Sequence, residues 1–394
     1  MTFDYTISIT SSWPPVGRPQ PPYGPTAIEV MRSCPLRNCF DASSGYERRM
    51  GVAARIGTAM HKTMQSLTEQ PIHADNIEAI AAETGQRFNT ELGVQRAHAF
   101  ERPREFRLQW DSVRINRALE AVIAEAIRTQ GSTEIPRIID FQSKPTIGNK
   151  GLAISSRQYA QKPLYLPACE VPVQSKNQLF RGRIDRVEQI PEGIRLIDYK
   201  SAYRDDLPER YTRQIQLYAF LWYETTDDWP VEGQVFYPLK GTFYHIPIKE
   251  YECRKVVNDA EVLIKEIANN SNLNNMAKPG YTCKVCEYRP WCRPFWEWQS
   301  TEKILVKAKE KASIGFEGEI VDISLIDHYW RLVIGWRGIK IRMVVPQERF
   351  PHLSNASVRQ VLRVLDAPLK GALNQPAVHV FDSTEIFLIS QTGI

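Results

Sequence analysis

Long apolar runs are missing from this chain of 394 residues, and so are several motifs that would assign it to a particular class of protein. No uncharged apolar stretch approaches the roughly 20 residues that a membrane-spanning helix needs, so we expect no membrane partner. The N-terminus lacks a basic start followed by an apolar core, so we expect no signal peptide and a cytoplasmic location. The chain has neither a G-x-x-x-x-G-K-[ST] phosphate loop nor an internal repeat, which argues against a built-in motor and against a repeat array.

Disulfides are not expected either, because the seven cysteines are an odd number in a chain that shows no sign of secretion. This leaves metal binding as the interpretation to test. The composition, with 43% hydrophobic and 24% charged residues, is that of an ordinary globular protein. The net charge of +5 and the pI of about 8.7 are compatible with nucleic acid binding but not diagnostic of it.

The length suggests two or three domains, and the sequence changes character along the chain. Residues 1–25 are rich in proline and predict an extended arm rather than a folded element. Residues 26–300 predict an α/β domain that begins with helices, including a helical insertion at about 70–130. Residues 130–160 show no regular pattern. Residues 303–394 contain the short alternating segments of a small β-barrel.

Hydrophobic periodicity places the elements of the α/β domain. Helices are predicted near 26–34 and at about 52–67, 74–92, 111–129, 207–223 and 250–269. Strands are predicted at 165–173, 182–188, 193–200, 233–237 and 241–248.

A lysine and two aspartates lie in one short stretch of this domain. Residues 182–188 and 193–200 each alternate apolar and polar residues, which is the period of a half-buried strand, and a turn separates them. The two strands should pair as a hairpin, with Asp185 on one strand and Asp198 and Lys200 on the other. Asp198 and Lys200 are two residues apart, so their side chains leave the same face.

Two carboxylates beside a lysine suit a hard divalent cation and an activated water, and therefore predict metal-assisted cleavage of a phosphodiester. The cation would neutralise the phosphate and help to stabilise the leaving alkoxide. Lys200 could hold or help deprotonate the attacking water and offset charge on the phosphate. Taken alone, an Asp-x-Lys pattern is more often an ordinary surface feature of a hairpin, so the prediction depends on the surrounding motifs.

Four short motifs occur one after another along the chain. They are Gly57-x-x-x-His61 on a predicted helix, Gly182-x-x-Asp185 and Asp198-x-Lys200 on successive strands, and Gln214-x-x-x-Tyr218 on the next helix. In this combination, over about residues 26–295, the chain resembles the RecB-like branch of the PD-(D/E)XK nuclease superfamily. The resemblance implies a restriction-endonuclease-like α/β core and a metal-dependent nuclease.

The resemblance also assigns roles to single residues. Asp185, Asp198 and the backbone carbonyl of Tyr199 would bind Mg²⁺ or Mn²⁺, and His61 would be a ligand or lie beside the metal. Lys200 would be the catalytic lysine. Two further residues, Gln214 and Tyr218, would position the substrate strand and the site. Glu170, on the preceding strand, stands where this branch often has an acid, and we rank it below the others. The alternative for His61, Gln214 and Tyr218 is ordinary helix packing.

Three of the cysteines form a C-x2-C-x5-C pattern: Cys283, Cys286 and Cys292. Three thiolates need a fourth ligand, for which Cys34 is the candidate. A four-thiolate cage suits zinc or an iron–sulfur cluster, and the x5 gap favours the cluster.

The split between one distant cysteine and three clustered ones resembles the iron–sulfur nucleases of the same branch, such as the AddB subunit and the CRISPR-adaptation nuclease. The resemblance implies a structural [4Fe–4S] cluster, with Zn²⁺ as the alternative. It favours Cys34, which precedes a proline, over the competitor Cys39. We expect Cys169 and Cys253 to pack as small apolar side chains.

The C-terminal segment resembles an OB-fold, with an SH3-like barrel as the alternative. Such a barrel could bind single-stranded nucleic acid through aromatic and basic side chains, or dock a protein. The candidate nucleic-acid-binding residues are Tyr329, Trp330, Arg331, Trp336, Arg337, Lys340 and Arg342. The alternative for the aromatic residues is that they form the core of the barrel.

The sequence therefore predicts a metal-dependent nuclease that acts on DNA, with single-stranded or single-strand-tailed DNA implied by resemblance only. The expected setting is DNA repair, end processing, or defence against foreign DNA. Members of this branch often work beside a helicase, which here would be a separate partner. The alternatives are a non-catalytic scaffold that binds DNA or a helicase, and a nuclease that acts on RNA.

Overall fold

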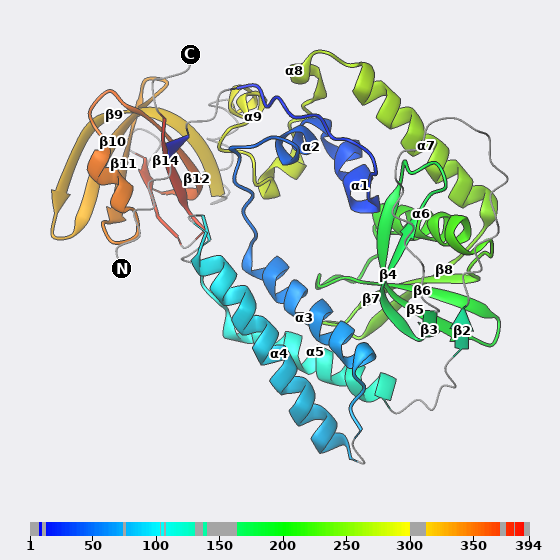
Figure 1. The fold of residues 1–394 in the computed structure, drawn as a ribbon. Coiled ribbons are helices and arrows are strands. Elements are labelled where there is room, and N and C mark those ends of the chain that lie inside the picture. The colour runs from blue at the N-terminus through cyan, green and yellow to red at the C-terminus, as the bar shows by residue number, and fades with distance from the viewer. Residues whose placement is uncertain are drawn as a thin grey trace.

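The computed structural model describes residues 8–9, 13–73, 76–102, 104–105, 108–130, 137–139, 164–299, 313–370, 376–381 and 383–389. Most of the segment that was predicted to be irregular, 130–160, lies outside these residues. The fold is mixed α/β, with helices at the N-terminal side, a central sheet and a second sheet near the C-terminus (Figure 1). No helix in the described ranges has the length and apolar character that crossing a membrane requires.

The N-terminal part contains α1 (Pro25–Ser33), α2 (Pro35–Asp41), α3 (Val52–Glu69), α4 (Ile77–Phe100) and α5 (Ser112–Gln130). All but α2 overlap a predicted helix, and α4 continues eight residues beyond its predicted end at 92. Between α1 and α2 the backbone of Cys34 is extended, with φ −162° and ψ 98°, because the following proline disfavours a helical residue before it. This break turns the Cys34 side chain out of the regular path of the two helices.

The proline-rich segment was predicted to be an extended arm rather than a folded element, and its described residues contact the folded parts of the chain. Strand β1 (Ser8–Ile9) pairs in parallel with β14 (Glu385–Ile389). The Trp13 ring lies 6.1 Å from that of Phe40, and Tyr23 is buried and forms a bridge to Phe180. Proline prevents regular secondary structure here, but the aromatic side chains still bury apolar surface.

The central sheet has five strands in the order β4-β5-β6-β7-β8 (Figure 1). The strands are β4 (Ala168–Gln174), β5 (Arg181–Ile190), β6 (Gly193–Tyr199), β7 (Glu232–Tyr237) and β8 (Thr242–Pro247). A separate short pair, β2 (Arg137–Ile139) with β3 (Leu164–Leu166), lies beside it. The predicted hairpin is present as the antiparallel pair β5–β6, whereas β6 and β7 run parallel and are connected through α6 (Glu209–Thr226).

The expectation that β5 and β6 are half-buried is wrong, because both faces of the sheet are covered. Leu196 packs in the cluster that includes α6 side chains, while Ile197 packs in the cluster that includes α3 and α5. Polar residues of these strands are therefore buried too: Arg186 is 6% exposed and Glu188 5% exposed, and they pair at 2.6 Å. A buried ion pair of this kind removes the penalty for leaving either charge alone.

The segment with the clustered cysteines follows α7 (Glu250–Asn269). It contains α8 (Leu273–Met276), the 3-10 turn η1 (Tyr281–Val285) and α9 (Arg293–Trp298). Figure 1 shows this segment beside α1 and α2, although some 250 residues separate them in the sequence.

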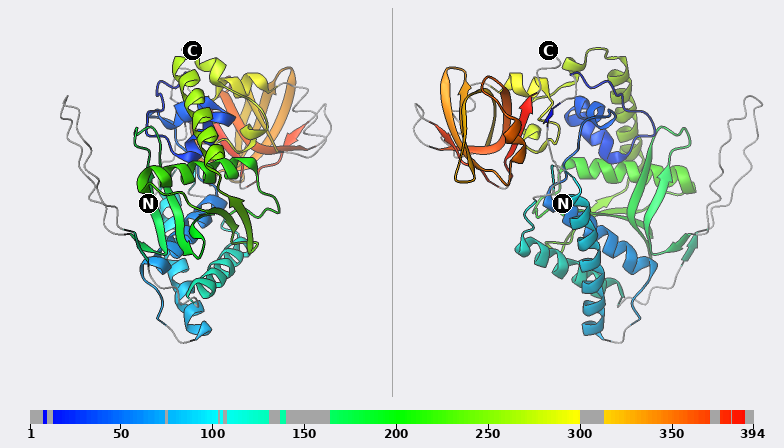
Figure 2. Two further views of the ribbon diagram at one scale, coloured as in Figure 1. Left: turned by 90° about the vertical axis from the view of Figure 1, so that its right-hand side faces the viewer. Right: turned by 60° about the vertical axis from the view of Figure 1, so that its left-hand side comes forward.

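The second sheet has the strand order β1-β14-β12-β13-β11-β10-β9. Its remaining strands are β9 (Ser313–Ile326), β10 (Tyr329–Trp336), β11 (Ile339–Pro346), β12 (Val361–Lys370) and β13 (Ala377–Val378), and the short helix η2 (Pro351–Asn355) precedes β12. Strand β12 also pairs with β9, so the sheet curls back toward its first long strand. Figure 2 shows this sheet standing against the cysteine-bearing segment.

Buried ion pairs connect the second sheet to the rest of the chain. The guanidinium of Arg104 donates to both carboxylate oxygens of Glu385 at 2.9 and 3.1 Å and lies over the Trp291 ring. Arg289 forms a second bidentate pair with Asp366, at 2.8 Å for both contacts. Burial alone would raise the pKa of Glu385, but Arg104 and Arg49 lower it, so this carboxylate remains ionised.

Candidate active site

Three carboxylates stand in a row across neighbouring strands of the central sheet. Cys169 pairs with Arg186 and Val171 with Ile184, so Glu170 on β4 lies opposite Asp185 on β5. Arg186 also pairs with Ile197, and one step further along this register Asp185 lies opposite Asp198 on β6. Directly opposed residues of antiparallel strands have side chains on the same face, so the register itself gathers the three acids.

Glu170 has an unusual backbone conformation in this row, with φ at +53°. A positive φ is uncommon for a residue with a Cβ, and such residues are often found at functional sites. Although Glu170 ranked below the other candidates from sequence, its carboxylate lies close to those of the others in the observed group.

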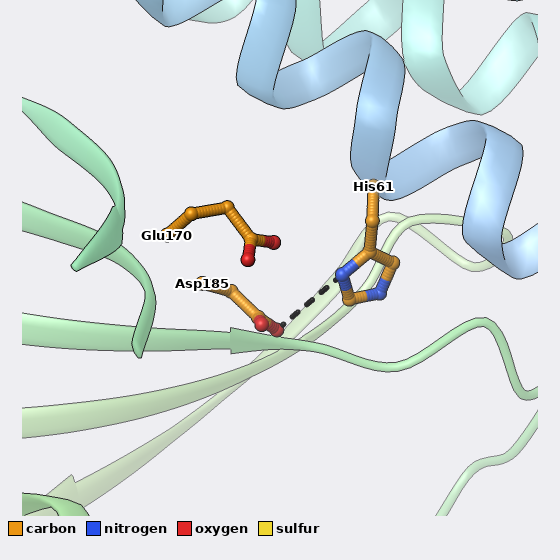
Figure 3. A group of neighbouring side chains, drawn as sticks. All are labelled: His61, Glu170 and Asp185. Atoms are coloured by element: carbon orange, nitrogen blue, oxygen red, sulfur yellow. Dashed lines mark ion pairs between the residues drawn. The ribbon is translucent and has the colours of Figure 1, made fainter. Parts of the chain in front are cut away.

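His61 completes the group from the opposite side. It lies on α3 and points toward the sheet, and its Nδ1 atom is 3.7 Å from Oδ2 of Asp185 (Figure 3). One ligand atom each from His61, Glu170 and Asp185 lie within 4.8 Å of one another, the only such trio found in the described residues. The two carboxylates of this trio are donors that suit Mg²⁺ or Mn²⁺. Asp198 was expected to share the cation but is not part of this trio.

Asp198 is instead paired with Lys200. Its Oδ2 atom lies 2.6 Å from the Lys200 ammonium, and the two side chains leave the same face as predicted. Burial alone would lower the pKa of Lys200, but Asp198 and Asp185 raise it, so the side chain is a cation at neutral pH. The Tyr211 ring lies 4.8 Å from the same ammonium. Lys200 is therefore held as a fixed positive charge beside the acids.

Asp185 is oriented by the neighbouring strand, because the backbone N–H of Tyr199 donates to its Oδ2 atom at 2.7 Å. Burial raises the pKa of Asp185, and Asp198 adds to this, while His61 and Lys200 oppose it. A carboxylate with a raised pKa beside other acids is typical of a site that gains from a bound cation. The Tyr199 amide thus has a clear role, and the metal-binding role of its carbonyl remains a prediction.

The Tyr199 side chain reveals residues that the sequence interpretation missed. Its hydroxyl is buried and donates to Oε1 of Glu125 on α5 at 3.1 Å, and Glu125 also pairs with Arg128. In the sequence, Glu125 and Arg128 are three residues apart on a predicted helix, which indicates only an ion pair along that helix. This spacing gives no sign that Glu125 contacts the sheet.

Two motif glycines permit the close approach of elements around the site. A Cβ atom on Gly57 would lie 2.5 Å from Oγ and 2.9 Å from Cβ of Ser201, the residue after Lys200. A Cβ atom on Gly182 would lie 2.6 Å from the Tyr218 ring. Gly57 therefore lets α3 approach the end of β6, and Gly182 makes room for Tyr218 against β5.

Gln214 and Tyr218 lie on α6 beside the carboxylates. Gln214 is 6% exposed and donates to the Thr26 hydroxyl at 3.4 Å, while its Oε1 atom is buried with no hydrogen-bond partner among the described residues. Burial raises the pKa of Tyr218 well above its usual value, and the charges of Asp198 and Asp185 add to this. Tyr218 therefore carries a protonated hydroxyl near the acids. The positioning role of these two residues, as opposed to ordinary helix packing, remains a prediction.

The four cysteines predicted to form a cage line a single cavity: Cys34, Cys283, Cys286 and Cys292. Burial raises the pKa of Cys286 to about 12 and also raises that of Cys292, so thiolates here require a bound cation. The competitor Cys39 is fully buried, with its Sγ atom 4.0 Å from the sulfur of Met276. All four cysteines line the cavity, but no three of the Sγ atoms of these described residues lie within 4.8 Å of one another, so the four-thiolate cage remains a prediction.

The proposed nucleic-acid residues of the second sheet are divided between surface and core. Arg331, Arg337 and Lys340 are exposed, as is Arg342, and Trp330 is partly buried. Trp336 is 6% exposed and packs in the core of this sheet, so the expectation that it lies on a binding surface is wrong. The alternation of the strand places it inward with Leu332 and Ile334.

The sequence profile of the PD-(D/E)XK nuclease superfamily matches residues 23–293, which contain every residue of the group described above. The chain belongs to this superfamily. Its members are generally nucleases that use divalent metals, which agrees with the trio of His61, Glu170 and Asp185. No match was found among the curated proteins.

Comparison with solved structures gives only weak likenesses. A replication factor A related protein from Methanobacterium thermoautotrophicum is 16% identical, with a TM-score of 0.19 and coverage of 20% of this chain and 82% of that one. SSO0001 is 14% identical, with a TM-score of 0.23 and coverage of 61% and 96%. The p202 HIN2 structure is 12% identical, with a TM-score of 0.17 and coverage of 20% and 42%.

Proposed function

We propose that this nuclease hydrolyses phosphodiester bonds of DNA with Mg²⁺ or Mn²⁺, on single-stranded or single-strand-tailed substrates. One observation carries the proposal: three carboxylates from adjacent strands stand in a row, with His61 on one side and a lysine ion pair on the other. The negative groups lie close together, which favours binding of a divalent cation. The bound cation would in turn bind a phosphate of the substrate.

The residues of the chain divide the work of the reaction between them. His61, Glu170 and Asp185 would hold the cation, which when bound supplies Lewis-acid stabilisation of charge on the phosphate. The protonated Lys200 donates hydrogen bonds toward the attacking water or the phosphate oxygens, and Asp198 holds it in place. This makes Lys200 an electrostatic group in its resting state rather than a base.

Gln214 and Tyr218 would position the substrate strand. The buried Oε1 atom of Gln214 is an acceptor that the described residues leave unused, and Tyr218 carries a donor close to the carboxylates. An unsatisfied buried acceptor is costly unless a ligand completes it, so Gln214 is suited to meet a donor on the bound strand or its water.

The cysteine cage would hold a structural [4Fe–4S] cluster, as in the iron–sulfur members of the RecB-like branch, with Zn²⁺ as the alternative. The presence of Cys34 and the three C-terminal cysteines in the lining of one cavity supports this assignment. Such a cofactor would fasten α1 and α2 to the segment after α7 and close the nuclease domain, 26–300. Its role would be to keep the substrate-facing helices in place.

The C-terminal part, 303–394, would be an OB-like barrel that binds nucleic acid or docks a protein partner such as a helicase. The parallel pairing of β11 with β13 and the return of β12 to β9 support this assignment. The exposed basic residues Arg331, Arg337 and Lys340 give it a surface for phosphates. The setting would be cytoplasmic DNA repair, end processing or defence.

Cleavage of matched DNA and RNA oligonucleotides tests the activity. Wild-type protein with Mg²⁺ or Mn²⁺ should cut DNA, and Asp198→Ala and Lys200→Ala should each lower the rate by about 100-fold or more. Asp259→Ala and Lys255→Ala, at exposed positions of α7, are controls with the same change of charge. Equal residual activity in the site variants and the wild type would support the non-catalytic scaffold, and preferential cutting of RNA would support the RNA nuclease.

A further inference from the structure

A second cavity, of about 280 Å³, is lined by Ser201, the residue that follows Lys200. Its walls come from the first half of α3, the start of α5 and the loops that follow β6 and β7. The lining residues used in the argument are Met60, Arg114, Arg117, Ser201, Tyr203 and Leu239. None of the four motifs contributes a defining residue to the lining of this cavity, although Met60 and Ser201 are sequence neighbours of the motif residues His61 and Lys200.

We propose that this cavity binds the nucleic acid strand adjacent to the scissile phosphate and holds a backbone phosphate on Arg114 and Arg117. The inference rests on the proposed function, and it adds a named subsite and a strand path to it.

The position of the cavity supports this assignment first. Ser201 directly follows Lys200, and Met60 directly precedes His61, so two walls of the cavity continue from the catalytic residues. Strands β6 and β7 are parallel, and Ser201 and Leu239 follow their carboxyl ends. Ligands of α/β sheets commonly bind at the carboxyl ends of parallel strands. Because consecutive Cα atoms are about 3.8 Å apart, the backbone that lines the cavity at Met60 and Ser201 adjoins that of His61 and Lys200.

The positive charge at the cavity also supports the proposed phosphate-binding subsite. Arg114 and Arg117 are exposed and three residues apart on α5, so both lie on one face of this helix. The Arg117 guanidinium lies 5.6 Å from the centre of the Tyr203 ring, and Lys240 lies 4.3 Å from the same ring. Tyr203 thereby fixes two cations at the cavity without neutralising them.

The acids around the cavity are already engaged. The carboxylate of Asp111, which also lines it, accepts a hydrogen bond from the Val113 N–H at 2.9 Å. Asp205 pairs with Lys240 at 2.6 Å. Arg114 and Arg117 are thus the cations best placed for an incoming phosphate, and arginine suits phosphate through its planar fork of donors.

A polynucleotide fits this geometry better than a free anion. The cavity is lined by the sequence neighbours of His61 and Lys200, and a strand whose reacting phosphate lies at the cation must leave the site on some side. The cavity offers space and the donors of Arg114 and Arg117, and its one lining acid among the described residues, Asp111, accepts a hydrogen bond from the Val113 N–H. We therefore assign Arg114 and Arg117 as positioning residues for the strand.

Salt-dependent binding tests the subsite without requiring cleavage. Fluorescence anisotropy of a labelled single-stranded DNA is measured in EDTA over a range of salt concentrations for wild type and for Arg114→Ala/Arg117→Ala. Each lost phosphate contact lowers the slope of log K against log salt by about 0.7 for single strands, so the double variant should lose about 1.4. The same relation predicts roughly tenfold weaker binding at 150 mM salt.

Lys255→Ala/Lys265→Ala, which removes two exposed charges from α7, is the charge-matched control. It should keep the wild-type slope. If Arg114→Ala/Arg117→Ala unfolds more easily, Arg114→Ala alone should still lose about 0.7 of slope. An unchanged slope in the folded arginine variants, or an equal loss in the α7 control, would overturn the subsite. If the arginine variants show the predicted loss of slope but the wild type never cleaves DNA, the nuclease proposal fails and the subsite stands.

Discussion

The contact between Gly57 and Ser201 gives a sharp test of how α3 is fitted to the catalytic strand. A Cβ atom at position 57 would lie 2.5 Å from Oγ and 2.9 Å from Cβ of Ser201, which is closer than such atoms approach. Alanine gains about 1 kcal/mol over glycine in a helix, and overpacking costs about 1–3 kcal/mol. Gly57→Ala should therefore change the free energy of unfolding by between about zero and a loss of 2 kcal/mol.

Gly93→Ala is the matched control. Gly93 lies in the interior of helix α4, and a Cβ atom there would meet nothing within 4 Å. This variant should be stabilised by about 0.5–1 kcal/mol, so the two alanine variants should differ by roughly 1–3 kcal/mol in denaturant unfolding. The difference isolates the close approach, because the intrinsic helix preference is the same in both.

Cleavage should respond to the same contact, because Ser201 follows Lys200 directly. A displacement of about 1 Å at a reacting group can cost on the order of 100-fold in rate, so Gly57→Ala should cleave DNA measurably more slowly while Gly93→Ala retains the wild-type rate. Adding Ser201→Gly removes both clashing atoms and should recover part of the stability and the rate. Gly57→Ala with full activity and the same stabilisation as the control would refute the reasoning.

The remaining predictions concern the cage, the interface and the site. Cys34→Ser should lose the brown colour and the broad absorbance near roughly 400 nm of anaerobically purified protein, whereas Cys39→Ser should keep both; a colourless wild type that contains zinc would exclude the cluster. Arg104→Ala should lower the free energy of unfolding by about 3 kcal/mol, because it leaves the Glu385 carboxylate buried with less compensation, and an unchanged melting temperature would contradict this. Tyr218→Phe should slow cleavage by about tenfold or more with little change in unfolding, since the ring that packs on β5 is retained and only the hydroxyl near the acids is lost; wild-type rates would remove its positioning role.

The sequence predicted the elements of the nuclease part well, because their signals are local. Alternation and periodicity located the hairpin that carries Asp185 and Asp198, and the four motifs identified His61 and Lys200. Burial was less predictable. Arg186 and Glu188 look like the exposed face of a strand in the sequence, yet they are buried, since covering of both faces of a sheet is a tertiary property.

The arrangement of the candidate metal ligands could not be predicted from the sequence either. Glu170 joins the trio of candidate metal ligands through its register with Asp185 and its positive φ, neither of which a single strand pattern reveals. The aromatic residues of the second sheet show the same limit, because alternation says that some are inward but not which, and Trp336 proved to be one of them. The α5 contribution to the site, through Glu125 and the arginines at its start, depends on how a helical insertion packs back on the sheet.

Binding of Mn²⁺ tests the central claim most directly, because it asks whether the gathered acids hold an ion at all. Electron paramagnetic resonance of Mn²⁺ titrated into the protein should count one tight site in the wild type. The same titration should show at least tenfold weaker binding in Asp185→Asn and in Glu170→Gln, each of which removes one negative ligand, and no change in Asp259→Asn on α7. Equal Mn²⁺ binding by all four proteins would contradict the account.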